Sequence, residues 1–480
     1  MLKKSILLFT TLLIGCIPLF SQTLISSELI GSQTKDNLIA QYGLNIFDYD
    51  VDFYKIEYTS LDITGLLDTV SGLLVVPDAS DKVFPLLCYQ HGTVGSKENV
   101  PSNLSGGYEI AEVWGSAGYT VFAPDYLGLG EGRGFHPYVH QASEASAAID
   151  MMEASKTFLN DNEFHFNDQL FITGYSQGGH AAAALHKELE ENYNNTITVT
   201  ASAPMSGPYS ISGVMQDFIY SETPYNFVSY LPYTLLSYQT AYGNIFTDVE
   251  DVFRSAYAPF VEDFYSGDID LGDLNQIFID MLTQEFGAPI PIKMLQDSVI
   301  NNVFTNYNHP INIAMRDNDV HNWAPQAPTR LYYCEGDDQV PFMNSVVASD
   351  TMNFLGANDL NAINVNSDFD HGECVQPAIF NAYIFFGTFQ QIDDIVDVNG
   401  HYLASKFTIF PNPTRDVFFI KNEKGDGRVQ LLNLDGKILL EKNLTLGFNE
   451  FSTADLEHGF YFLKIKIGDS FFVEKMVVQD

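Results

Sequence analysis

The chain has 480 residues, and 46% of them are hydrophobic, which is enough for one large core and a smaller one and too much for a disordered chain. The formal net charge of −38 argues against nucleic acids and anionic membrane surfaces as partners. Residues 405–480 hold 10 basic and 11 acidic side chains, whereas residues 1–404 hold 13 and 50. This uneven charge predicts two domains that meet near residue 400.

The N-terminus has the pattern of an export signal. Two lysines precede an apolar run from Ile6 to Phe20, which is too short and too early in the chain for a stable membrane span. We therefore expect residues 1–22 to be a signal peptide that is cleaved near Ser21. An alternative stays open, because the run from Leu13 to Cys16 is similar to a lipoprotein cleavage box and lipidation of Cys16 would anchor the protein to a membrane.

Cleavage of this signal would leave three cysteines, Cys88, Cys334 and Cys374. In an exported chain an odd count leaves one thiol unpaired. Cys88 lies in an apolar run that is typical of a buried strand, so we expect it in the core. Cys334 and Cys374 are candidates for a disulfide, but the sequence alone does not give the distance between them.

Short apolar runs alternate with helical patterns along residues 23–400, which predicts an α/β domain with a mostly parallel sheet and helices on both faces. Reactive groups gather at the carboxyl ends of the strands in such a sheet. The expected elements are an antiparallel strand pair at 52–63 and 69–76, strands at 84–89, 119–123, 169–173 and 197–203, and helices at 109–117, 141–158 and 180–189.

Residues 208–328 interrupt the alternation with 20 aromatic and only 3 basic side chains, and we interpret them as a mainly helical cap inserted over the sheet. Helical pieces are expected there around 249–264 and 274–286. The run from Asp268 to Asp273 is faintly similar to a calcium loop but lacks its glycine and final glutamate, so we expect a solvated loop. The alternation then resumes with strands at 329–334 and 362–365 and helices at 344–355 and 375–389.

Residues 405–480 predict a small all-β sandwich. Its six expected strands lie at 407–410, 417–420, 429–432, 438–440, 460–467 and 471–478. The Asp-Gly pair inside the run from Leu434 to Lys437 is typical of a two-residue hairpin turn.

One short pattern indicates chemistry. Gly174-Tyr175-Ser176-Gln177-Gly178 stands between an expected strand and an expected helix. In that context Gly-x-Ser-x-Gly predicts a nucleophile elbow, a sharp turn that exposes the serine hydroxyl and leaves no room for a Cβ at the glycines. A plain glycine turn would show the same residues, so the interpretation needs catalytic partners elsewhere in the chain.

A serine nucleophile needs a base within hydrogen-bond reach and a carboxylate that orients the base. The acid is expected after the strand at 329–334, where Asp337 and Asp338 are adjacent. The base must come later in the chain. His371 follows the last strand directly, whereas His401 and His458 fall at or beyond the domain boundary, so we expect His371 to be the base of Ser176.

The oxyanion formed in acyl transfer needs N–H donors that are already in place. We expect one from Gln177, at the start of the helix after the elbow, and one from Thr93, in the loop after the strand at 84–89.

Four other polar side chains lie in nearby loops and helices. Asp125 is expected to cap a loop and His180 to pack against its helix. His136 and His140 fit either a pocket wall or a surface loop, and the sequence leaves this open.

Residues 50–392 resemble the α/β-hydrolase family. The elbow, the acid and the histidine come in the family's order, and the segments from Pro124 to Gly130 and from His136 to Tyr138 are similar to secretory-lipase-like members. The resemblance implies hydrolysis of carboxylic esters and a cap that shapes the acyl pocket. The family's usual Asp-x-x-Val-Pro form favours Asp337 over Asp338 as the acid. We expect neither a cofactor nor a metal.

Three segments of the last domain are similar to a known export module: Pro411 to Thr414, Gly459 to Leu463 and Glu474 to Val478. Through them, residues 405–480 resemble the C-terminal sorting domain of the type IX secretion pathway of the Bacteroidetes. The resemblance implies export through the periplasm to a secreted or cell-surface location, with the outer-membrane secretion machinery as a partner and with removal of the domain.

The sequence thus predicts a secreted esterase or lipase that cleaves small-molecule or lipid esters through an acyl-enzyme. A serine peptidase of the aminopeptidase type on the same fold is the alternative. It would need a carboxylate pair in the cap to hold an α-amino group, and the 15 acidic residues between 208 and 328 leave room for one. A cell-surface binding module with a vestigial triad is the non-enzymatic alternative.

Overall fold

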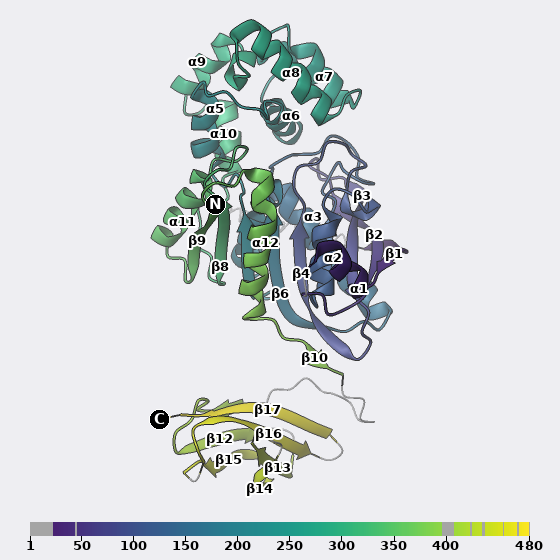
Figure 1. Ribbon diagram of the computed structural model, residues 1–480, viewed down its shortest axis with the longest axis vertical. Coiled ribbons are helices and arrows are strands. Elements are labelled where there is room, and N and C mark those ends of the chain that lie inside the picture. The colour runs from purple at the N-terminus through teal and green to yellow at the C-terminus, as the bar shows by residue number, and fades with distance from the viewer. Residues whose placement is uncertain are drawn as a thin grey trace, which may run out of the picture. The chain divides into compact units, whose positions relative to one another are not determined.

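The computed structural model describes residues 23–43, 46–395, 408–422, 425–433, 437–454, 456–467 and 470–479 (Figure 1). The chain divides into two compact units, Met1–Asp394 and Ile395–Asp480. The expected signal peptide with Cys16, the histidine His401 and residues 434–436 of the expected hairpin turn lie outside the described residues.

A ten-stranded sheet organises the first unit. In spatial order its strands are β1 (Leu24–Gln33), β2 (Val51–Leu61), β3 (Leu67–Pro77), β5 (Thr120–Pro124), β4 (Lys82–Gln90), β6 (Phe166–Tyr175), β7 (Ala201–Met205), β8 (Thr329–Cys334) and β9 (Leu360–Asn366), with β10 (Asp393–Asp394) paired to β4. The strands from β5 across to β9 are parallel, and β1, β2, β3 and β10 pair antiparallel. The predicted alternation is confirmed, whereas β1 and the short helix α1 (Lys35–Tyr42) are additions to it.

Helices cover both faces of this sheet. On one face, α3 (Gln141–Asp161) and α4 (Gln177–Asn192) pack over Leu86 and Cys88, while on the other α2 (Tyr108–Ser116) and α12 (His371–Gly387) pack over Leu87 and Tyr89. Successive residues of β4 therefore enter different cores, as expected of a strand buried on both faces. Cys88 is buried and unpaired, in the core position that the sequence predicts.

One more helix of the alternation, α11 (Met343–Leu355), connects β8 to β9. Among the described residues, no helix has both the length and the apolar character that crossing a membrane requires.

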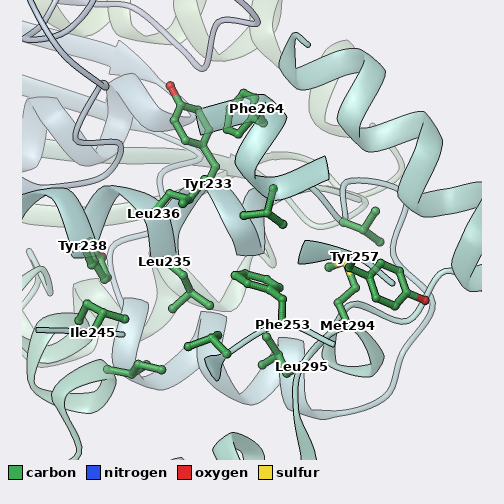
Figure 2. Close-up of a cluster of buried hydrophobic side chains, with 14 of the residues drawn as sticks. Tyr233, Leu235, Leu236, Tyr238, Ile245, Phe253, Tyr257, Phe264, Met294 and Leu295 are labelled. Carbon is green, nitrogen blue, oxygen red and sulfur yellow. The ribbon is translucent and has the colours of Figure 1, made fainter. Parts of the chain in front are cut away.

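Between β7 and β8 the chain builds the cap, whose helices gather at one end of the unit (Figure 1). Its elements are η2 (Ile211–Met215), α5 (Gln216–Tyr220), α6 (Tyr230–Tyr242), η3 (Val249–Asp251), α7 (Ala258–Ser266), α8 (Leu271–Phe286), η4 (Pro291–Met294), α9 (Asp297–Thr305) and α10 (Pro310–Asp317). The cap has an apolar core of its own, to which α6 contributes Leu235 and Leu236, α7 contributes Phe264, and the segment between them contributes Phe253 (Figure 2).

Two details of the cap refine the predictions. The helical pieces expected around 249–264 are present as η3 and α7, and Phe253 separates them by forming a β-bridge with Leu295. In the acidic run, Asp270 caps α8 by accepting a hydrogen bond of 2.7 Å from the Asp273 N–H.

The second unit is a sandwich of two antiparallel sheets. One contains β11 (Thr408–Phe410), β12 (Val417–Asn422) and β15 (Gly447–Ser452), and the other contains β14 (Ile438–Leu444), β13 (Gly427–Leu432), β16 (Gly459–Ile467) and β17 (Ser470–Val478). Apolar side chains from both sheets form one core. The predicted fold is confirmed, but six strands is wrong, because β15 is a seventh among the described residues.

Candidate active site

Ser176 stands on a sharp turn between β6 and α4. Its φ of 61° and ψ of −123° are unusual for a residue with a side chain. A Cβ at Gly174 would collide with the Gly178 carbonyl oxygen, and one at Gly178 would collide with that of Gln90. The backbone geometry is therefore that of the predicted elbow, and both glycines are required by close backbone approach.

Asp337 and His371 come from neighbouring strands. Asp337 lies in the loop after β8, and His371 follows β9 as the first residue of α12. The His371 Nδ1 lies 2.7 Å from Asp337 Oδ2, and the other carboxylate oxygen accepts hydrogen bonds from the N–H groups of Gln339 (3.0 Å) and Val340 (2.8 Å). Because an ionised carboxylate only accepts, Nδ1 carries the proton and Nε2 is left as the basic nitrogen.

The adjacent aspartate has a different contact. An oxygen of Asp338 accepts a hydrogen bond of 3.3 Å from the backbone N–H of His371 rather than from its ring. The structure therefore brings both aspartates to His371, but only Asp337 meets the imidazole.

Tyr175 connects the histidine to the elbow. Its hydroxyl donates a hydrogen bond of 2.7 Å to the His371 carbonyl, and the centres of the two rings are 4.9 Å apart. Since Tyr175 immediately precedes Ser176, this contact holds the start of α12 beside the turn that carries the serine. The sequence carries no signal of this role, because the position before the serine in the elbow pattern accepts any residue.

A disulfide ties the two segments that carry Asp337 and His371. Cys334, the last residue of β8, is bonded to Cys374, in the first turn of α12. Asp337 lies three residues after one cysteine and His371 three residues before the other. The pairing that the sequence left open is thus present, and it spans the part of the fold where Asp337 and His371 meet.

The two expected oxyanion donors flank the elbow. Gln177 is the first residue of α4. Thr93 lies in the loop after β4 and directly follows Gly92, where an added Cβ would lie 3.9 Å from Ser176 Cβ. Within the described part of the chain, neither backbone N–H donates to a protein acceptor. Both are therefore available to a ligand, and the helix dipole adds positive potential at Gln177.

A cavity lies between the cap and the sheet and has Ser176 in its wall, with about 940 Å³ of empty space when the open solvent at its mouth is included. It is lined by Tyr138, Val139, Ser176, Gln177, Pro208, Ile211, Met215, Gln216, Ile219, Tyr220, Tyr225, Tyr230, Leu231, Thr234, Leu235, Leu295, Val299, Ile311, Met315, Gln339 and Val340. None of these described lining residues is charged. The cavity suits an apolar group attached to the bond that Ser176 would attack.

Asp125 lies away from the imidazole of His371. Its buried carboxylate accepts hydrogen bonds from the Ser71 hydroxyl (2.6 Å) and the Ser102 N–H (3.0 Å), and burial raises its pKa above the usual value. This is the loop-holding role that the sequence predicts. His140 lies at the start of α3, with Nδ1 3.0 Å from the Ser143 hydroxyl, and it does not line the cavity.

Two sequence families match parts of the chain. The secretion system C-terminal sorting domain matches residues 408–479, and the prolyl oligopeptidase family matches residues 108–235. None of the curated proteins compared with the chain matches it. The predicted sorting domain is thus confirmed, and it marks the chain for type IX export to a secreted or cell-surface location.

Solved structures resemble the first unit. A putative hydrolase from Legionella pneumophila has 26% identity and a TM-score of 0.69, over 76% of this chain and 98% of that one. The rice cell wall degrading esterase LipA from Xanthomonas oryzae has 27% identity and a TM-score of 0.65, over 77% and 98%. Candida antarctica lipase A shares the fold at 13% identity, with a TM-score of 0.52 over 73% and 77%. These similarities confirm the α/β-hydrolase fold and support a serine hydrolase.

Proposed function

We propose that the protein is a secreted carboxylic-ester hydrolase with Ser176 as nucleophile, His371 as base and Asp337 as the acid that orients it. The observation that carries the proposal is the uncharged cavity with Ser176 in its wall, next to the hydrogen-bonded Asp337–His371 pair. Ester cleavage needs an apolar acyl site and a serine with a base, and it needs no charged group to hold the substrate.

The proposed reaction has two halves. Ser176 Oγ attacks the ester carbonyl while His371 Nε2 takes its proton, and the N–H groups of Gln177 and Thr93 stabilise the oxyanion. The tetrahedral intermediate collapses as His371 protonates the leaving alkoxide, which departs as an alcohol. Water activated by the same histidine then attacks the acyl-enzyme and releases the carboxylic acid.

Replacing the nucleophile tests this directly. Ser176→Ala should lower kcat for p-nitrophenyl esters by about 10⁶-fold, because no other group attacks the carbonyl. Thermal unfolding should stay close to wild type, which a circular-dichroism melt would check. A panel of esters from acetate to palmitate gives the preferred acyl length. Activity that survives the substitution would exclude Ser176 as the nucleophile.

A serine peptidase is the second candidate, and the prolyl oligopeptidase match over residues 108–235 favours it. A peptidase that holds a free α-amino group needs a carboxylate near the serine, and the described residues that line the cavity include none. Aminoacyl-naphthylamides distinguish the two: their hydrolysis by a chain that leaves p-nitrophenyl esters intact would replace the ester proposal. A chain that neither cleaves substrates nor reacts with a fluorophosphonate would be a binding module.

A further inference from the structure

A connected cluster of polar side chains lies buried behind the elbow, and we call it the Gln177 network. It consists of Gln177, Glu144 from α3, His180 from α4 and His136 from the loop after β5. The Gln177 amide nitrogen donates to Glu144 Oε1 at 3.1 Å and to His136 Nε2 at 2.8 Å. The other oxygen of Glu144 lies 2.7 Å from His180 Nδ1, and both of these side chains are 0% exposed.

The contacts of His180 make it a cation. Its Nδ1 faces the Glu144 carboxylate and its Nε2 lies 2.9 Å from the Asn318 carbonyl, so both ring nitrogens meet acceptors and both carry protons. Burial alone lowers the pKa of His180, but attraction to Glu144 and the hydrogen bonds outweigh burial and raise it. Glu144 and His180 therefore form a buried ion pair.

His136 is neutral by the same reasoning. Its Nδ1 donates to the Leu127 carbonyl at 2.8 Å, and burial lowers its pKa to about 4. Its Nε2 is therefore only an acceptor, which fits the N–H that Gln177 directs at it.

These states leave the Gln177 side chain one orientation. Both protons of its amide nitrogen are used by groups that only accept, and a flipped amide would place its oxygen against the Glu144 carboxylate. The backbone of the same residue begins α4 and carries an expected oxyanion donor. The amide group of the Gln177 side chain is thus held by Glu144 and His136, and α4 holds the backbone of the same residue. Together these contacts fix the direction of the Gln177 backbone N–H.

We propose that Glu144, His180 and His136 are positioning residues, which hold Gln177 so that its backbone N–H points at the oxyanion of the ester reaction. The inference rests on the proposed function, because the oxyanion arises when Ser176 attacks an acyl group. Burying an ion pair costs more free energy than burying an apolar cluster of the same size. A contribution to stability is therefore a weak explanation for the Glu144–His180 pair at this place.

The same helix supplies a matched control. His186 of α4 lies 3.0 Å from Glu190, and its side chain is 1% exposed. This pair has the same chemistry but stands ten residues along α4 from the elbow, roughly 15 Å away at the rise of an α-helix. Glu144→Gln and Glu190→Gln therefore each remove a carboxylate that pairs with a histidine of α4, one near Ser176 and one far from it. The Glu190 side chain is 16% exposed and also accepts from the N–H groups of Gln326 and Ala327.

The test uses the full chain and corrects every rate for the titrated fraction of active sites. An alkyl trifluoromethyl ketone forms a hemiketal with the serine, so its Ki reports how well the oxyanion is held. Glu144→Gln should lower kcat for p-nitrophenyl butyrate by about 10–100-fold and raise the Ki of the ketone by the same factor. KM should stay within about twofold of wild type. Glu190→Gln should leave both per-site values within about twofold of wild type, because its carboxylate is remote from the elbow.

A second variant guards against misfolding of the first. Gln177→Met removes both side-chain hydrogen bonds but keeps the ion pair and the backbone N–H, and the same loss is expected. The proposal is overturned if per-site kcat and Ki of these variants match those of Glu190→Gln, or if only the titre of active sites falls.

Labelling by a fluorophosphonate separates the two proposals. A wild-type chain that hydrolyses no ester but is labelled contradicts the proposed substrate, and the positioning role is then decided by whether Glu144→Gln slows labelling more than Glu190→Gln does. A wild-type chain that neither hydrolyses esters nor is labelled overturns both the proposed function and the positioning role.

Discussion

Asp337 and Asp338 have the same side chain but contact different parts of His371. With Asp337→Asn, the amide would donate to Nδ1 and move the ring proton to Nε2, which removes the base, so kcat should fall by about 10⁴-fold. Asp338→Asn keeps the ring contact of Asp337, and kcat should fall by less than about tenfold. Per-site kcat of the two variants on p-nitrophenyl butyrate checks the assignment of Asp337 as the acid. Equal losses of kcat in the two variants would contradict that assignment.

At the scale of residues, the chain order of motifs predicts Ser176 and His371, but the choice between the two aspartates needed a family resemblance. The Gln177 network has no comparable signal. Gln177 meets His136 and Glu144 across 41 and 33 positions of sequence, and neither partner belongs to a spaced motif. Such contacts arise when α3 and the loop after β5 pack beside α4, so only the folded chain reveals them.

At the scale of elements, the disulfide joins β8 to α12 across a sequence separation of 40. By loop-closure entropy it should contribute about 4 kcal/mol to the stability of the first unit. Replacing Cys334 and Cys374 by serine should lower the free energy of unfolding of that unit by this amount in a urea titration. A reductant should destabilise wild type similarly and leave the double variant unchanged, since Cys88 is unpaired. Wild type that is insensitive to reductant would contradict the prediction.

The missed elements share a weak apolar pattern. Burial alternates along β15, but residue type does not follow it, because Asn449 faces the same side as the buried Phe451 while Phe448 on the other side is 67% exposed. Five successive residues of β1, from Ile25 to Leu29, are exposed, which leaves backbone pairing with β2 to define that strand. Strands of the buried parallel sheet carry the opposite signal, and their positions follow closely from the sequence.

At the scale of the whole molecule, every residue of the candidate site belongs to the first unit, and each unit has its own core. A chain that ends at Ile395 should therefore keep kcat/KM for p-nitrophenyl butyrate within about twofold of the full chain. Calorimetry should show one transition for this chain and two for the full one. Loss of activity on truncation would mean that the second unit contributes to the site.

The disulfide also has a consequence for timing. Cysteine pairs stay reduced in the cytosol and oxidise in the periplasm. The bond between the segments that carry Asp337 and His371 therefore forms only after the chain has left the compartment where it is made. If Asp337 and His371 act as proposed, the disulfide at the active site forms only after the enzyme has been separated from the esters of the cytosol. Oxidation of one cysteine pair then couples maturation of the enzyme to its export.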